Sequence, residues 1–413
     1  MQNRISIICF VIGAYLMSSC ATGNSTLIGN RDVYVVNLDT INERAVLPLS
    51  NIYSSVKAIV LENDKALLGN INKLQPYQDK LFILDSQIAK GLYEFDREGH
   101  FIRKIGQIGS APGEYSGCGD FAINEQTNEI YVYDYRNHIY KYDLQTGKYK
   151  DVLNLEKENI IDRIWVNGGN LYAVNCGFYP NQSRPYYILK EIDTTNGKKI
   201  GEWMKNDEYN KGWIDSYMSF RCFYSIGNDM DLFTYGMSDS IMCIRDGKIS
   251  PYAALTGKKL IQKDDIPSED LTPSTDGYLR TRQSGNLFES WRKQGKISGI
   301  SNLFQYKQMI FFEIMGMYAY TVQYNISDDK VSIYGSTKEN LLFTKEPKHW
   351  YLPSFLTADE SGTYYCVEPM FLPEFKHFAT EKGVMSDKVI NKDKLEKLDE
   401  DSNPVILYYE FKK

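Results

Sequence analysis

The chain has 413 residues, of which 43% are hydrophobic and 24% charged, a composition that excludes wholesale disorder and a multi-span membrane protein. Lysine and arginine number 47 against 53 aspartates and glutamates, so the net charge is −6. No basic run is dense enough to neutralise a row of phosphates, which argues against nucleic acid as a partner. The 32 tyrosines and 19 phenylalanines favour β-strands, where aromatic side chains fit a half-buried surface.

The N-terminal segment has the pattern of an export signal. Arg4 supplies a positive start, residues 5–17 an apolar run, and Ser18-Ser19-Cys20 a small-residue cleavage site. The apolar run is too short to span a bilayer. The segment resembles a bacterial lipoprotein signal, although Met17 stands where such signals usually have Leu. An ordinary secretory signal with an unmodified Cys20 is the alternative.

The lipoprotein resemblance implies that residues 1–19 are removed, that Cys20 carries the lipid anchor, and that residues 20–32 form a tether. Lipoproteins of the Bacteroidetes that reach the cell surface tend to carry acidic residues directly after the cysteine. The residues that follow here are Ala21-Thr22-Gly23-Asn24. The resemblance therefore implies an outer-membrane lipoprotein that faces the periplasm rather than the cell surface.

A short alternating strand with an aromatic residue at its second position recurs six times along the chain. The six copies are residues 81–85, 130–134, 171–175, 232–236, 310–313 and 363–367. The first five copies are each followed by two alternating strands around a polar turn, and other short strands, such as residues 120–124, precede the copies.

Four strands per unit and six units predict an all-β fold, a six-bladed β-propeller of four-stranded antiparallel blades over residues 33–413. The last unit lacks a fourth strand, so an N-terminal strand, either residues 33–39 or residues 56–62, is expected to close the ring. A β-sandwich is the alternative, but it does not explain six similar copies.

Two insertions interrupt the repeat. Residues 256–296 are polar and contain Pro and Gly breakers, which predicts a long surface loop. Residues 373–403 lie inside the last unit, where Phe375, Phe378 and Ala379 have i, i+3, i+4 spacing. We therefore expect one or two helices inserted in the last blade.

The stretch Ile105-Gly-Gln-Ile-Gly-Ser-Ala-Pro-Gly-Glu-Tyr115, the strand ending at Asp134 and the closing strand from Asn403 resemble the six-bladed β-propeller lipoproteins of Bacteroidetes, relatives of the NHL and TolB-like propellers. The resemblance implies a six-bladed fold and an envelope location. It implies no settled activity. Gly106, Gly109 and Gly113 permit a tight connection between blades, so the motif is interpreted as structural.

No motif in the sequence predicts a metal or a cofactor, and none is expected. The histidines are scattered, and no cysteine pair has C-x-x-C spacing. Without Cys9 and Cys20, five cysteines remain, which are interpreted as buried small hydrophobic residues with one disulfide possible. They are Cys118, Cys176, Cys222, Cys243 and Cys366.

In a propeller, the loops between second and third strands and the connections between blades gather at one mouth of the channel. These segments bring aromatic and arginine residues to that mouth, namely Tyr115, Tyr135, Arg136, Tyr179, Arg184, Tyr209, Trp213, Tyr278, Arg280, Arg282, Trp291 and Arg292. Aromatic faces beside guanidinium groups suit sugars, peptides or an anionic partner. A tyrosine-rich chain, however, places aromatic residues at many other positions too.

The leading hypothesis is a non-enzymatic, lipid-anchored envelope propeller that binds an oligosaccharide, a peptide or an envelope protein. The ligand-binding residues proposed are Tyr115, Arg136, Tyr179, Arg184, Trp213, Trp291 and Arg292. Trp213 and Trp291 are the expected exposed anchors, so their replacement should leave melting nearly unchanged. No catalytic residue is assigned.

Two other functions stay open. A glycan-active hydrolase or lyase would use carboxylates such as Glu114 or Asp134 as acid and base. A scaffold subunit of an outer-membrane transport complex would need no site of its own. The sequence sets neither the ligand nor the oligomeric state.

Overall fold

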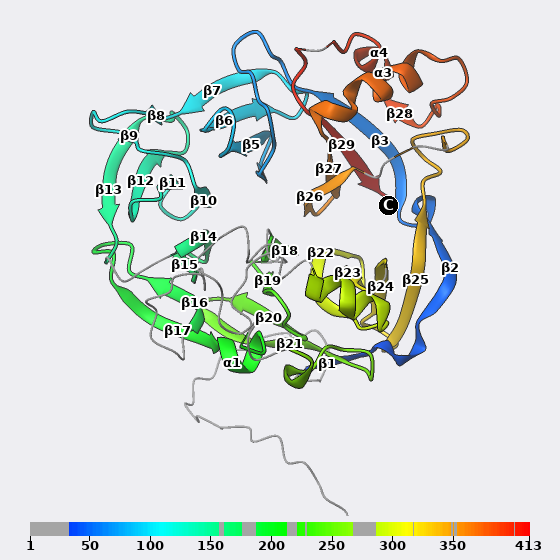
Figure 1. The fold of residues 1–413 in the computed structure, drawn as a ribbon. Coiled ribbons are helices and arrows are strands. Elements are labelled where there is room, and N and C mark those ends of the chain that lie inside the picture. The colour runs from blue at the N-terminus through cyan, green and yellow to red at the C-terminus, as the bar shows by residue number, and fades with distance from the viewer. Residues whose placement is uncertain are drawn as a thin grey trace, which may run out of the picture. The chain divides into compact units, whose positions relative to one another are not determined.

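In the computed structural model, six sheets of four or five strands each are arranged in a ring around a common centre (Figure 1). The structure describes residues 33–156, 161–175, 187–212, 221–227, 229–266, 286–316, 318–347, 350, 353–399 and 401–413. The first strands of neighbouring blades pack against one another, and the later strands lie farther out. The prediction of a six-bladed β-propeller is confirmed.

The first three blades have four antiparallel strands each. Blade 1 contains β4 (Lys73–Tyr77), β5 (Lys80–Asp85), β6 (Gly91–Asp96) and β7 (Phe101–Ile105). Blade 2 contains β10 (Asp120–Asn124), β11 (Glu129–Tyr133), β12 (His138–Asp143) and β13 (Tyr149–Asn154). Blade 3 contains β14 (Ile161–Asn167), β15 (Asn170–Asn175), β16 (Tyr187–Ile192) and β17 (Lys199–Lys205), and α1 (Asn206–Tyr209) follows it.

The last three blades have five strands each, because N-terminal strands join them. Blade 4 contains β18 (Phe223–Ser225), β19 (Asp231–Phe233), β20 (Ser240–Arg245), β21 (Lys248–Thr256) and β1 (Tyr34–Asn37). Blade 5 contains β22 (Ser298–Tyr306), β23 (Met309–Met315), β24 (Ala319–Asn325), β25 (Lys330–Lys338) and β2 (Asn42–Pro48). Blade 6 contains β26 (Ser354–Asp359), β27 (Gly362–Val367), β29 (Val405–Phe411), β3 (Tyr53–Val60) and β28 (Val389–Ile390).

The recurring aromatic residue lies on the second strand of every blade and is buried. The six side chains are Phe82, Tyr131, Tyr172, Phe233, Phe311 and Tyr364, each at most 1% exposed. They belong to the hydrophobic clusters in which adjacent blades pack together. The aromatic residue therefore recurs in the sequence because each blade packs against its neighbours through the same position.

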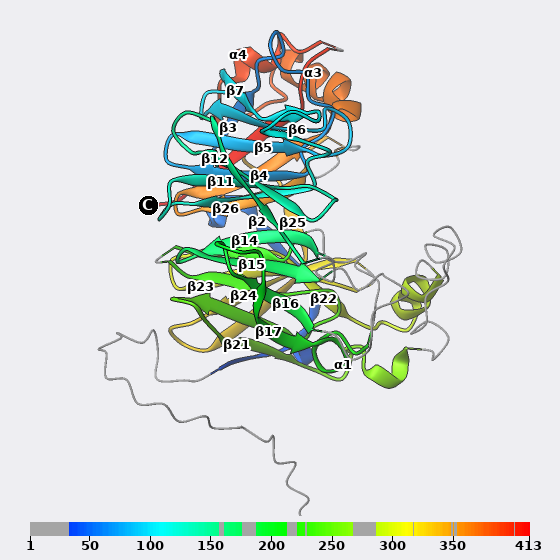
Figure 2. The same ribbon diagram turned by 90° about the vertical axis from the view of Figure 1, so that its left-hand side faces the viewer.

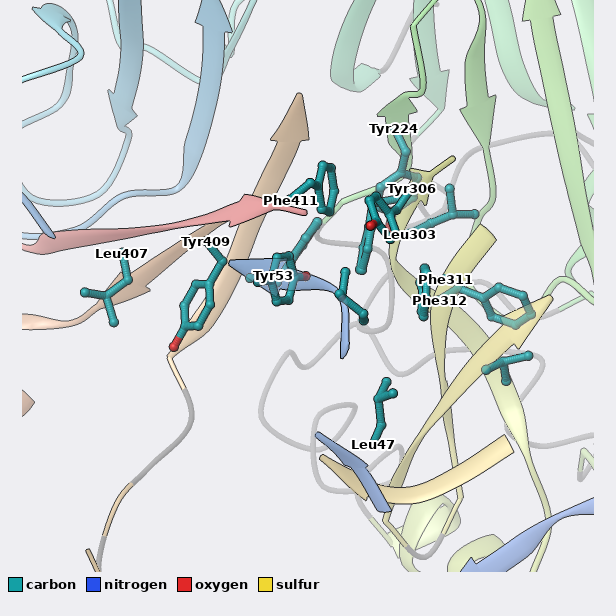
Figure 3. Close-up of a cluster of buried hydrophobic side chains, with 14 of the residues drawn as sticks. Leu47, Tyr53, Tyr224, Leu303, Tyr306, Phe311, Phe312, Leu407, Tyr409 and Phe411 are labelled. Atoms are coloured by element: carbon teal, nitrogen blue, oxygen red, sulfur yellow. The ribbon is translucent and has the colours of Figure 1, made fainter. Parts of the chain in front are cut away.

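The ring is closed by β3, which pairs antiparallel with β29 and completes blade 6. Tyr53 of β3 stacks on Phe411 of β29, with ring centroids 5.6 Å apart, and Phe411 stacks in turn on Tyr306 of blade 5 (Figure 3). Of the two candidate closing segments, the later one therefore overlaps the strand that closes the ring. The earlier one forms β1, which runs parallel to β21 of blade 4.

The sequence analysis did not predict that β1 and β2 extend other blades. Both run parallel to an outermost strand, β1 along β21 and β2 along β25. Short 3-10 helices, Leu38–Thr40 and Leu49–Asn51, separate the three N-terminal strands. The N-terminal segment thus passes along the outside of blades 4 and 5 before β3 enters blade 6 between β29 and β28 (Figure 1).

The insertion in blade 6 is helical, as expected. It contains a 3-10 helix (Pro369–Phe371), α3 (Leu372–Thr380), β28 and α4 (Lys392–Leu395). Phe375, Phe378 and Ala379 of α3 are buried, and Phe375 stacks on Trp350 with centroids 5.6 Å apart. The helices lie beside blade 6 at the rim of the ring (Figures 1 and 2). Of the other insertion, the structure describes a 3-10 helix (Lys263–Asp265) and a helix over residues 286–293.

The glycine-rich connection between blades 1 and 2 contains the parallel strands β8 (Gln107–Ile108) and β9 (Glu114–Tyr115). Gly106 and Gly113 have φ angles of 62° and 83°, which disfavour other residues. An added Cβ at Gly109 would lie 1.8 Å from the Glu114 carboxylate, so the Glu114 side chain would have to move from its hydrogen bond with the Ala111 N–H.

Candidate functional site

Two cavities follow each other along the channel. In blades 1 to 4 and 6, the beginning of the first strand lines one cavity and the end of that strand lines the other. Trp165 and Thr357 line both and therefore lie between them. We call the first the Arg cavity and the second the acidic cavity, after the charged side chains in their walls.

The Arg cavity has a volume of about 260 Å³ and lies at the mouth to which Tyr135, in the loop between β11 and β12, contributes. This is the mouth at which the sequence predicted a ligand site. Its wall is formed by Asn72, Lys73, Leu74, Leu84, Ser86, Gln87, Gly119, Asp120, Tyr135, Asp162, Arg163, Trp165, Arg221, Cys222, Phe223, Leu356 and Thr357.

Lys73 and Asp120 form a compensated pair in this wall. The Lys73 ammonium lies 2.9 Å from the Asp120 carboxylate and donates to the backbone oxygens of Phe121 and Ile164. The other Asp120 oxygen accepts from the Ile164 backbone N–H at 2.7 Å. Because all of these partners are protein groups, the pair joins β4, β10 and β14 and has a structural role.

Arg163 also has a carboxylate partner, but Arg221 does not. Arg163 donates to the carboxylate of its neighbour Asp162 at 2.7 Å. The Nε of Arg221, in contrast, is buried and has no hydrogen-bond partner, and its guanidinium has no ion pair in the described part of the chain. Burial lowers the pKa of Arg221, and the like charge of Arg163 lowers it further. The site therefore contains a cationic group whose charge no described residue compensates.

An aromatic wall stands beside these arginines. The rings of Trp165 and Phe223 are stacked, with centroids 5.5 Å apart and planes 7° from parallel. Tyr135 is 63% exposed at the mouth, and its ring packs edge-on against Tyr133. Apolar aromatic surface next to a guanidinium suits the binding of sugars and planar carboxylates.

The structure places two of the predicted ligand residues in or near blade 2. Arg136 is exposed beside Tyr135, and its backbone N–H donates to Asp134. Tyr115 is fully buried instead, because its ring packs between blades 1 and 2 and its hydroxyl donates to the Ile105 oxygen. Tyr115 is therefore a packing residue and not part of an open surface.

Trp291 and Arg292 lie in the helix over residues 286–293, and neither lines the Arg cavity. Trp291 is 3% exposed and packs edge-on against Phe288, with centroids 5.4 Å apart. It is not the exposed anchor that its polar neighbours in the sequence suggested. Arg292 is exposed and lines a separate cavity of about 200 Å³ with Glu43 and Lys259.

Six of the predicted mouth residues lie outside the described residues, namely Tyr179, Arg184, Trp213, Tyr278, Arg280 and Arg282. Their role stays a prediction. Tyr209, at the end of α1, packs against the hydrophobic cluster of blades 3 and 4.

Sequence reasoning missed Lys73, Arg163 and Arg221. It searched the loops, whereas these side chains lie on or just before the innermost strands. The sequence pattern that could have identified these residues is a charged residue at the start of an otherwise apolar first strand. A propeller can accept such a residue only where the strand faces the channel.

The carboxylates considered for glycan hydrolysis close turns. Glu114 accepts from the Ala111 N–H and from Gln107, and these hydrogen bonds lower its pKa. Asp134 is fully buried and accepts from Ser116 and from the backbone N–H groups of Arg136 and His138. Neither residue lines the Arg cavity or the acidic cavity.

Four of the five remaining cysteines are in the described part, and all four are buried free thiols. They are Cys118, Cys222, Cys243 and Cys366. Burial raises the pKa of Cys222 to about 12 and that of Cys243 to about 11. Cys176 lies outside the described residues. Within the described ranges, no group of three potential metal ligands is present, and no helix is both long and apolar enough to cross a membrane.

A family model described as a domain of unknown function, DUF4934, matches residues 33–410. Among solved structures, a Bacteroides fragilis protein described as exported has 18% identity and a TM-score of 0.66, with 92% of this chain and 100% of that chain covered. A member of the DUF4221 family from Bacteroides vulgatus has 11% identity and a TM-score of 0.48, with coverages of 87% and 97%. No curated protein matches the chain. At these identities the likeness concerns the fold.

Proposed function

The chain belongs to the DUF4934 family, and we propose that it is a non-enzymatic binding protein whose Arg cavity holds the carboxylate of an acidic oligosaccharide. The observation that carries the proposal is Arg221, whose buried Nε has no hydrogen-bond partner. An uncompensated guanidinium destabilises the empty protein, because burial removes it from water without supplying an acceptor. A ligand carboxylate would supply the acceptors in a bidentate geometry.

The neighbouring side chains support a sugar as the rest of the ligand. The stacked Trp165 and Phe223 contribute apolar surface to the wall, and Ser86 and Gln87 offer hydroxyl and amide groups in the same cavity. A peptide or an envelope protein could present the same carboxylate, so these sources are separate arms of the experiment. Either source would agree with the ligand classes expected from the sequence.

The test measures binding by purified full-length protein to a panel of uronic-acid oligosaccharides, neutral oligosaccharides of the same length and acidic peptides. Arg221→Gln should weaken binding of the acidic sugar by about 10- to 100-fold, because a charge-assisted hydrogen bond contributes about 1.5–3 kcal/mol. The same substitution should leave the melting temperature unchanged or raise it, since Arg221 has no partner in the empty protein.

The matched control is Arg292→Gln, which removes an exposed arginine outside the Arg cavity and should change neither quantity. If acidic peptides bind and acidic sugars do not, the ligand is a peptide carboxylate and not a sugar carboxylate. Two results would overturn the proposal. One is the absence of binding by every acidic probe, and the other is an Arg221→Gln protein that binds as well as the wild type.

The location proposed for this function is the outer membrane, with a lipid anchor on Cys20 and the propeller in the periplasm. The export-type N-terminal sequence supports it, and a structural neighbour is described as exported. A periplasmic propeller would meet envelope glycans and imported oligosaccharides.

A further inference from the structure

The acidic cavity lies at the other end of the channel and has a volume of about 450 Å³. All six blades contribute to its wall, mostly through the ends of their first strands. The wall consists of Gln75, Pro76, Ile123, Glu125, Gln126, Trp165, Val166, Asn167, Gly168, Gly169, Ser225, Ile226, Gly227, Asp229, Asp231, Asp246, Gln305, Thr357, Ala358, Asp359 and Glu360.

Six carboxylates line this cavity, and its described wall contains no lysine, arginine or histidine. Asp359 is compensated from outside by Arg97, with the two groups 2.8 Å apart. The other five carboxylates form no ion pair within the described residues, and they are Glu125, Asp229, Asp231, Asp246 and Glu360. Burial and the nearby Asp229 raise the pKa of Glu125, and burial raises the pKa of Asp231. The wall therefore has an excess of negative charge.

A second, independent observation concerns neutral acceptors. Asn167 is 5% exposed, and its Nδ2 donates to the Asp229 backbone oxygen and to the Asp231 carboxylate. These two acceptors fix the orientation of the amide, so Oδ1 is the atom that has no partner. The Oε1 of Gln75 in the same wall is also buried without a donor. Buried acceptors without donors are rare in proteins and point to a ligand that brings N–H groups.

We propose that the acidic cavity binds an organic cation with two or more alkylammonium groups. Each ammonium carries three N–H donors, which matches carboxylates beside unpartnered amide oxygens. The carboxylates come from blades 2, 4 and 6 around a wide cavity. Among the described residues no three potential metal ligands form a group, so these carboxylates do not form a site for a single metal ion. An extended cation spans such a ring of charges.

The test uses the full-length protein at low ionic strength with three probes, namely spermidine, a trilysine peptide and Ca²⁺. Binding is measured by calorimetry and by the shift in melting temperature. Spermidine or trilysine should bind and raise the melting temperature, and Glu125→Gln or Asp229→Asn should weaken that binding about tenfold or more. Asp229→Asn suits the site, because residue 229 has a φ of 55° and asparagine tolerates that conformation.

Glu289→Gln is the matched control, because it removes an exposed carboxylate outside the cavity and should not change amine binding. Arg221→Gln should also leave amine binding intact, which separates this site from the Arg cavity. Binding of spermidine alone or of trilysine alone would identify the source of the ammonium groups. Binding of Ca²⁺ alone, of no probe, or of amines equally well by the Glu125→Gln and Asp229→Asn proteins would overturn the proposal.

Discussion

Trp291 shows why a side chain's neighbours in the sequence do not decide its exposure. It lies among Ser290, Arg292 and Lys293, yet its indole packs with Met237 and Ile261 in a small satellite cluster. Its N–H donates to the Asp265 backbone oxygen at 3.2 Å. The insertion between blades 4 and 5 thus packs onto Met237 of blade 4 through apolar residues of its own, although most of its residues are polar. Only the fold brings these apolar residues together.

We therefore expect Trp291→Ala to cost about 3 kcal/mol of unfolding free energy, because it removes a large buried ring and leaves a cavity. Urea unfolding of the variant measures this loss. The control is Arg292→Ala on the same helix, which is exposed and should stay within about 0.5 kcal/mol of wild type. An unchanged midpoint for Trp291→Ala would mean that the satellite cluster does not stabilise the propeller.

At the level of elements, the N-terminal strands explain why the ring has no open edge in blade 6. Without β3, the outer side of β29 would expose unpaired backbone groups over seven residues. The outer strands β1 and β2 are fitted closely as well. A Cβ added to Gly335 of β25 would lie 2.0 Å from the Glu43 backbone oxygen of β2, so only glycine allows this approach.

Deleting residues 21–63 should therefore destabilise the whole ring or cause aggregation, because it removes one strand from each of three blades. The comparison is with a deletion of residues 21–31, which removes none of the strands that the structure describes. Circular dichroism melting checks both proteins. If the protein without residues 21–63 melts as cooperatively as the control, these N-terminal strands do not close the ring.

For the whole molecule, the number of blades could be predicted, because an inter-blade aromatic recurs in every unit at a fixed place in its strand. The opposite charge of the two cavities could not be predicted from the sequence. Arg163 and Arg221 lie 58 positions apart in the sequence and meet only when blades 3 and 4 pack, and the acidic residues come from separate blades. A net charge of −6 therefore gives no information about the distribution of charge along the channel.

The location of the whole molecule is tested at Cys20, the cysteine directly after the apolar run. Cys20→Ala should move the protein from the detergent phase to the aqueous phase in membrane fractionation, because one acylated cysteine is the expected anchor. Cys118→Ala is the matched control and should keep the protein in the detergent phase, since that thiol is buried in the propeller. Membrane retention of the Cys20→Ala protein would contradict lipid anchoring.

The pairing of β3 with β29 also has a consequence for how the chain folds. Val60 pairs with Val405, so the closing strand leaves the ribosome 345 residues before its partner. At about 5–20 residues per second, that delay is roughly 17–70 s. β1 and β2 are likewise synthesised before their partner strands β21 and β25. Three β-forming segments therefore stay without partners through most of synthesis, which makes them the natural targets of a chaperone that holds the nascent chain unfolded.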